Sequence, residues 1–144
     1  MTRPAVIVDT NVVVAGLLTG NDASRVVPNS ARILDGMLAA AFPFVVSEAL
    51  LAEYRTVLVR PVLRKQHGLT VAEVEAILTD LAQHAIVLAP LAAPPAPDPG
   101  DQLLWGLLAA RADLLLVTGD KLLLRDSGMQ GRVISPSAFV SAAS

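Results

Sequence analysis

Four acidic residues stand at positions from which their carboxylates could meet, although they are far apart along the chain. Asp9 directly follows the apolar run at residues 5–8, and Asp120 follows a second such run within Thr118-Gly119-Asp120. Asp101 comes just before the apolar segment LLWGLLAAR. Successive residues of a helix are rotated by about 100°. With this rotation, Glu53 borders the apolar stripe of a predicted helix and Glu48 lies on the opposite face. These four carboxylates are candidates for one crevice.

Such a crevice needs something to offset its charge. Two carboxylates about 4 Å apart repel by about 4 kcal/mol at an effective dielectric constant near 20. Either bound protons or a divalent cation can relieve that repulsion. The chain has no cysteine, and its two histidines show no metal-binding spacing, so oxygen ligands would hold the ion, and these favour Mg²⁺ or Mn²⁺. Such ions activate water and neutralise phosphate charge, as in metal-dependent nucleases.

The elements that would position these acids are short apolar strands alternating with helices. The strand candidates are residues 5–8, 44–46, 86–88, 114–117 and 133–134. Their apolar, partly β-branched character is typical of strands buried on both faces. The alternation predicts an α/β fold with a mainly parallel sheet of about five strands. Ligands of such sheets bind beyond the carboxyl ends of the strands, where Asp9 and Asp120 are expected.

Caps and apolar stripes locate several helices. One begins near Ser30, and another runs between residues 47 and 59 and carries Glu53. Thr70 and Glu73 form a capping box that predicts a helix from residue 71 onward. Ser135 followed by Pro136 predicts a short C-terminal helix. The proline-rich stretch at residues 90–99 is expected to be a loop that leads into a helix.

Composition limits the class of protein. The 144 residues are 53% hydrophobic, 17% charged and 3% aromatic, which predicts a single domain over residues 1–144 and argues against disorder and base-stacking surfaces. The net charge of −2 provides no general attraction to nucleic acid. We expect a cytoplasmic protein without a membrane segment, since no apolar run approaches about 18 residues. We also expect no nucleotide cofactor, since no glycine-rich phosphate loop occurs.

Four pieces of the sequence, in order, resemble the PIN-domain family, in particular the bacterial VapC-like toxin group. The pieces are VIVDTNVVVAGLL, VSEALLAEYRTVL, DPGDQLLWGLLAARADLLLVTGDKLL and VISPSAFV. The resemblance implies a three-layer α/β/α sandwich. It also implies that the four acids hold one or two Mg²⁺ or Mn²⁺ ions and that an activated water hydrolyses RNA phosphodiesters.

The same resemblance implies supporting residues and partners. Asn11 would orient Asp9 through a hydrogen bond, and Thr118 would support the site near Asp120. A toxin of this kind would be neutralised by an antitoxin protein, through a peptide at the acidic crevice, and would pair as a homodimer.

Some features depart from the family pattern. Gly100 and Gln102 flank Asp101, and Leu122 follows Lys121, where relatives often carry further acids. Asp98 could supply part of that charge or be a turn residue. The structural alternative for Asp101 and Asp120 is that each is only a helix N-cap. A degenerate module that binds RNA or a protein without cutting, or a metal-dependent phosphatase, therefore remains an alternative function.

Basic residues near the acids are candidates for phosphate contacts. Arg55, Arg60, Arg64 and Lys65 form a basic stretch after Glu53, and Lys121 adjoins Asp120. Either set could contact an RNA backbone or simply form a solvated face. The remaining residues of note have structural interpretations: His67 and His84 are predicted on the surface, and Trp105 in the core or an interface.

Overall fold

The computed structural model describes residues 4–18, 28–126, 129 and 131–143. Its strands are β1 (Val6–Val8), β2 (Val45–Val46), β3 (Ile86–Val87), β4 (Leu115–Val117) and β5 (Val133–Ile134). A sheet in the order β1-β4-β5 and a pair β2-β3 are parallel throughout. A parallel bridge between Val6 and Phe44 joins them. Across this bridge the strands lie in the order β3-β2-β1-β4-β5, all parallel, which agrees with the predicted parallel arrangement of about five strands, although the two sheets share only this one bridge.

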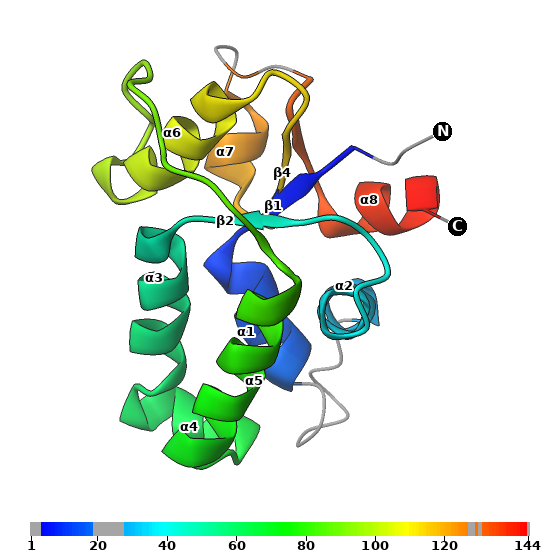
Figure 1. Ribbon diagram of the computed structural model, residues 1–144, viewed down its shortest axis with the longest axis vertical. Coiled ribbons are helices and arrows are strands. Elements are labelled where there is room, and N and C mark those ends of the chain that lie inside the picture. The colour runs from blue at the N-terminus through cyan, green and yellow to red at the C-terminus, as the bar shows by residue number, and fades with distance from the viewer. Residues whose placement is uncertain (1–3, 19–27, 127–128, 130, 144) are drawn as a thin grey trace.

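Helices cover both faces of this sheet (Figure 1). They are α1 (Thr10–Leu18), α2 (Pro28–Leu38), α3 (Glu48–Leu58), α4 (Pro61–His67), α5 (Val71–His84), α6 (Gln102–Ala110), α7 (Lys121–Leu124) and α8 (Pro136–Ala143). In Figure 1, α6 and α7 lie on one side of the strands and α1, α3 and α5 on the other. This is the expected three-layer α/β/α arrangement.

The inner strands β1, β2 and β4 are apolar because both of their faces are covered. The same expectation is wrong for β3, which lies at the edge of the sheet with Ile86 36% and Val87 56% exposed. Val6, Ile7 and Val8 are at most 1% exposed. One apolar cluster joins these strands to side chains from the helices on both sides, among them Tyr54 of α3 and Trp105 of α6. Trp105 is therefore in the core, as predicted.

The predicted helix starts are present with their capping bonds. Thr70 Oγ1 accepts the Glu73 N–H and Glu73 Oε1 accepts the Thr70 N–H, both at 3.1 Å. Ser47 Oγ accepts the Leu50 N–H at 3.1 Å at the start of α3, and Ser135 caps α8 in the same way. Such bonds satisfy backbone donors that the first helical turn leaves free.

The proline-rich stretch is a loop, as expected, and it ends in a short 3₁₀ turn at Pro99–Asp101. Gln102 holds it from α6, because its Nε2 donates to the Pro94 carbonyl at 3.1 Å and its Oε1 accepts the Ala96 N–H at 2.8 Å. The Leu91 N–H also donates to the Gly106 carbonyl at 3.0 Å. These contacts fix where the chain enters α6, and hence where Asp101 stands.

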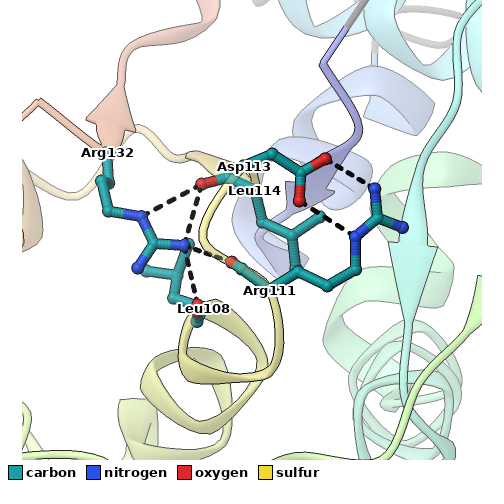
Figure 2. Close-up of polar contacts among 5 residues, drawn as sticks. All are labelled: Leu108, Arg111, Asp113, Leu114 and Arg132. Atoms are coloured by element: carbon teal, nitrogen blue, oxygen red, sulfur yellow. Dashed lines mark hydrogen bonds and ion pairs between the residues drawn. The ribbon is translucent and has the colours of Figure 1, made fainter.

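Figure 2 shows how β5 is tied to the end of α6. The partly buried Arg132 donates through Nη2 to the carbonyls of Leu108 and Arg111, each at 2.7 Å, and of Leu114 at 3.2 Å. Arg111 in turn pairs with Asp113. A guanidinium at a helix C-terminus satisfies carbonyls that lack helical partners and complements the helix dipole.

The prediction that His67 lies on the surface is wrong. Its ring is 3% exposed, because α4 folds back against the end of α3. The ring Nε2 lies 2.9 Å from the Leu58 carbonyl, and Nδ1 accepts the Leu69 N–H at 3.0 Å. His84, at the end of α5, is exposed as predicted. Within the described residues, no helix is long and apolar enough to cross a bilayer.

Candidate active site

A pocket of about 590 Å³ opens beyond the carboxyl ends of β1 and β4. It is lined by carboxylates from four separate elements, Asp9, Glu53, Asp101 and Asp120. We call it the acidic pocket and these residues the four acids. Asp9 follows β1, Glu53 lies on α3, Asp101 precedes α6 and Asp120 follows β4. The sheet therefore brings together residues that are up to 111 positions apart in the chain.

Asp9 is the most buried of the four acids, at 6% exposure. Its Oδ2 accepts hydrogen bonds from the Thr118 hydroxyl at 2.7 Å and from Asn11 Nδ2 at 3.3 Å. Thr118 Oγ1 also accepts the Asp120 N–H at 3.0 Å. The single Thr118 hydroxyl therefore links Asp9 to the backbone of Asp120, and both supporting residues contact the acids expected of them.

The four acids repel one another. Burial raises the pKa of Asp9, a rise that the Thr118 hydrogen bond opposes and the charges of Glu53 and Asp120 increase. The pKa of Asp101 is raised to about 6, first by burial and then by the charges of Asp9 and Asp120, with smaller effects of Asp98 and Glu53. Within the part of the chain that the structure describes, the ion pairs involve other residues, and no Lys or Arg pairs with any of the four acids.

Glu53 is oriented by Thr10, which is not one of the site residues predicted from the sequence. The Thr10 hydroxyl at the start of α1 donates to Glu53 Oε2. Beside it, the buried Tyr54 donates its hydroxyl to the Val8 carbonyl, which anchors α3 to the end of β1. Neither contact has a local sequence signal, because each joins residues more than forty positions apart.

The capping alternatives have different outcomes for the two candidate caps. Asp120 does cap α7, since its Oδ1 accepts the Leu122 N–H at 2.9 Å, and it lines the acidic pocket as well. Asp101 precedes α6 but its side chain makes no capping bond. Asp98 caps the 3₁₀ turn by accepting the Gly100 N–H at 2.8 Å, as in the turn-residue interpretation, and is not among the residues that line the pocket.

The basic residues predicted to contact phosphate differ in their distance from the acidic pocket, and only some of them line it. Arg60 lines the acidic pocket. Arg55 forms an exposed ion pair with Glu75 of α5, so a phosphate contact would compete with that pair. Lys121 is exposed beside Asp120 but is not one of the residues lining the pocket. The apolar part of the wall comes from α1 and α3, through Val14, Ala15, Leu18 and Val57.

The chemistry of these donors fits a hard divalent cation. Hydrogen bonds hold only one side-chain oxygen of Glu53 and of Asp120, so each has a second oxygen facing no donor among the described residues. The side chains are not drawn together, however: within the described residues, no three acidic or histidine side chains are close enough to share one ion. The four acids repel one another when no cation is bound. A bound cation would therefore have to draw their side chains closer together.

A parallel α/β sandwich with an acidic pocket at its strand ends has the architecture of a nuclease-type domain. The family model described as "PIN domain" matches residues 5–122, and the chain belongs to the PIN-domain family. Members of this family are generally nucleases and generally use divalent metal ions. A search of curated proteins finds none that matches the chain.

Proposed function

We propose that this protein is a Mg²⁺- or Mn²⁺-dependent endoribonuclease and that the four acids are its catalytic and metal-binding residues. One observation carries the proposal. Four carboxylates line one pocket, where burial first and their mutual repulsion second raise the pKa of Asp9 and of Asp101, and no Lys or Arg among the described residues pairs with any of them. A divalent cation is the ligand that best relieves such an arrangement.

The roles of the residues follow from their contacts. Thr118 and Asn11 fix one oxygen of Asp9, and Thr10 fixes one oxygen of Glu53. A bound divalent cation supplies activation of water and neutralisation of charge on the phosphate. Asp101, with its pKa of about 6, holds a proton part of the time near pH 6 in the metal-free protein. Cation binding would release that proton, so affinity for the ion should rise with pH.

We further propose that the protein is the toxin of a toxin–antitoxin pair, and that it works as a homodimer. The support is the resemblance of its four motif pieces to the VapC-like group. An antitoxin would then insert a peptide in or near the acidic pocket. Co-purification with the product of a neighbouring gene, together with loss of RNA cleavage in the complex, is the expected result.

The direct test is cleavage of RNA by the purified protein. We expect cleavage with Mg²⁺ or Mn²⁺, none with EDTA, and a loss of at least a hundredfold for Asp9→Asn. Asp80→Asn is the matched control, because Asp80 is an exposed acid on α5, and it should leave cleavage unchanged. Cleavage that survives both EDTA and Asp9→Asn would refute the assignment.

The second candidate is a PIN-like module that binds RNA or a protein without cutting. Two observations favour it: the four acids are not within shared ligand distance among the described residues, and Gln102 next to Asp101 holds the proline-rich loop. Thermal unfolding in Mn²⁺ separates the candidates. A cation site at 100 times its dissociation constant should add about 2.7 kcal/mol to the free energy of unfolding, whereas the non-catalytic module should gain nothing.

A further inference from the structure

The segment that follows Glu53 has a charge pattern unlike the rest of the chain. Between Glu53 and Glu73 there is no acidic residue, yet four of the eleven Lys and Arg residues of the protein lie there. The chain as a whole carries a net charge of −2. The positive charge is therefore local, and it adjoins the acidic pocket.

The structure separates these four cations into two groups. Arg55 is paired with Glu75. Arg60, Arg64 and Lys65 are exposed, and none forms an ion pair within the described residues. Glu73, the nearest acid beyond them, is engaged in the capping box with Thr70. Only the second group is free to bind an external anion.

The three free cations form a row along α4. Arg60 is the N-cap of α4 and lines the acidic pocket. Arg64 lies in the first turn of α4, and its backbone N–H donates to the carbonyl of Arg60 at 2.9 Å, so the backbones of these two residues adjoin where the extended Arg60 leads into the helix. Arg64 and Lys65 line a second hollow of about 480 Å³, together with Pro61 and Thr70. The row thus leads from the acidic pocket to this second hollow.

The helix that carries the row is held firmly at both ends. Pro61 begins α4, and Gly68 ends it with φ of 73°, a conformation that glycine adopts without strain. The buried His67 bridges the Leu58 carbonyl at the end of α3 and the Leu69 N–H just before α5. The cations are therefore presented on a fixed scaffold, which lowers the entropy lost on binding.

We propose that Arg60, Arg64 and Lys65 bind the phosphate backbone of single-stranded RNA beside the acidic pocket, with Arg60 next to the phosphate that is cut. This inference rests on the proposed function. An acidic pocket repels a polyanion, so adjacent cations are needed to hold the strand there. The chain is only 3% aromatic, so base stacking contributes little and backbone contacts must dominate. Such contacts position the strand without reading its sequence.

The test measures RNA affinity and cleavage in parallel. Binding of labelled U-rich and A-rich oligoribonucleotides is measured in EDTA from 50 to 300 mM salt. Since log K falls by about 0.7 per phosphate contact for each tenfold rise in salt, Arg64→Gln should weaken binding about fivefold at 0.1 M salt and reduce the slope by about 0.7. Adding Lys65→Gln should double both logarithmic changes. In Mn²⁺, KM should rise while kcat is kept, because these residues position the strand.

Charge reversal provides the matched control. Arg64→Glu and Arg32→Glu change the net charge equally, and Arg32 is an exposed helical arginine on α2 that is not among the residues lining either hollow. Both variants should fold with melting temperatures near that of the wild type, and only Arg64→Glu should lose RNA affinity. Equal losses in the two variants, or an unchanged salt slope for Arg64→Gln, would overturn the proposed backbone site while leaving the nuclease intact. A wild-type protein that neither binds nor cleaves RNA would instead overturn the proposed function.

Discussion

Neutralising Asp101 should make the metal-free protein more stable while abolishing its activity. Asp101 is partly buried at the start of α6, and the charges of Asp9 and Asp120 add to the effect of burial in raising its pKa to about 6. The folded state therefore disfavours the ionised form of this carboxyl. Asp101→Asn removes the charge and keeps the shape, so the repulsion disappears with little change in packing.

The magnitude follows from the pKa. A rise from 3.8 to about 6 corresponds to about 3 kcal/mol at pH 7 for a carboxylate shielded from water. Because Asp101 is only partly buried, solvent screening reduces the expected gain for Asp101→Asn to about 1 kcal/mol. For a chain of this length the melting temperature should rise by about 3 to 4 °C.

The pH dependence has a definite sign. Between about pH 4 and pH 6 the folded protein retains a proton on Asp101 that the unfolded chain has released, so wild-type stability falls as pH rises through this window. The advantage of Asp101→Asn should be absent below pH 4, grow across the window and be complete above pH 6. With Mn²⁺ at pH 7 the wild type should be more stable than Asp101→Asn, because only the wild type has all four carboxylates to bind the ion.

Thermal unfolding of the wild type and Asp101→Asn from pH 4 to pH 8, in EDTA and in Mn²⁺, measures these differences in stability. Asp113→Asn is the control of opposite sign, since the Arg111 hydrogen bond lowers the pKa of Asp113, and its neutralisation should reduce stability. If Asp101→Asn is less stable than the wild type at pH 7 in EDTA, the four acids do not repel one another in a shared pocket.

Three further substitutions test the supporting contacts by chemical denaturation and activity. Thr118→Val removes the hydroxyl that donates to Asp9 and accepts the Asp120 N–H. The free energy of unfolding should fall by about 2 kcal/mol, and RNA cleavage should decrease. Unchanged cleavage would show that Asp9 does not need this hydrogen bond. His67→Ala removes both bonds that hold α4 and should cost about 3 kcal/mol, with kcat retained if α4 serves only to bind RNA. Arg132→Met keeps an unbranched apolar stem but removes the guanidinium, so the carbonyls at the end of α6 lose their donor. The free energy of unfolding should fall by about 2 kcal/mol, and a fall below about 0.5 kcal/mol would mean that water replaces the guanidinium.

The parts of the fold that the sequence predicts are those with a local physical cause. Residues 5–8 and 114–117 are apolar throughout because β1 and β4 are covered on both faces. The capping box of Thr70 and Glu73 lies within four residues, so its prediction needs no tertiary information. The placement of Glu53 toward the pocket and Glu48 toward solvent follows in the same way from helical periodicity.

What the sequence could not supply is any contact made across the fold. The burial of His67 has no local sequence signal, because it depends on α4 packing against the end of α3, where the ring contacts the Leu58 carbonyl. Arg55 pairs with Glu75 across α3 and α5. This pairing cannot be read from the basic stretch, so the sequence offers no reason to prefer Arg60 to Arg55 as a phosphate-binding residue. Thr10 likewise meets Glu53 only because α1 packs against α3.

The most direct test is a crystal structure of the protein soaked in Mn²⁺, with anomalous scattering used to locate the ions. We predict one or two Mn²⁺ ions inside the acidic pocket, with the side chains of the four acids drawn closer together than in the metal-free structure. Manganese bound only elsewhere, or a pocket whose four carboxylates stay apart at saturating Mn²⁺, would contradict the proposed nuclease site.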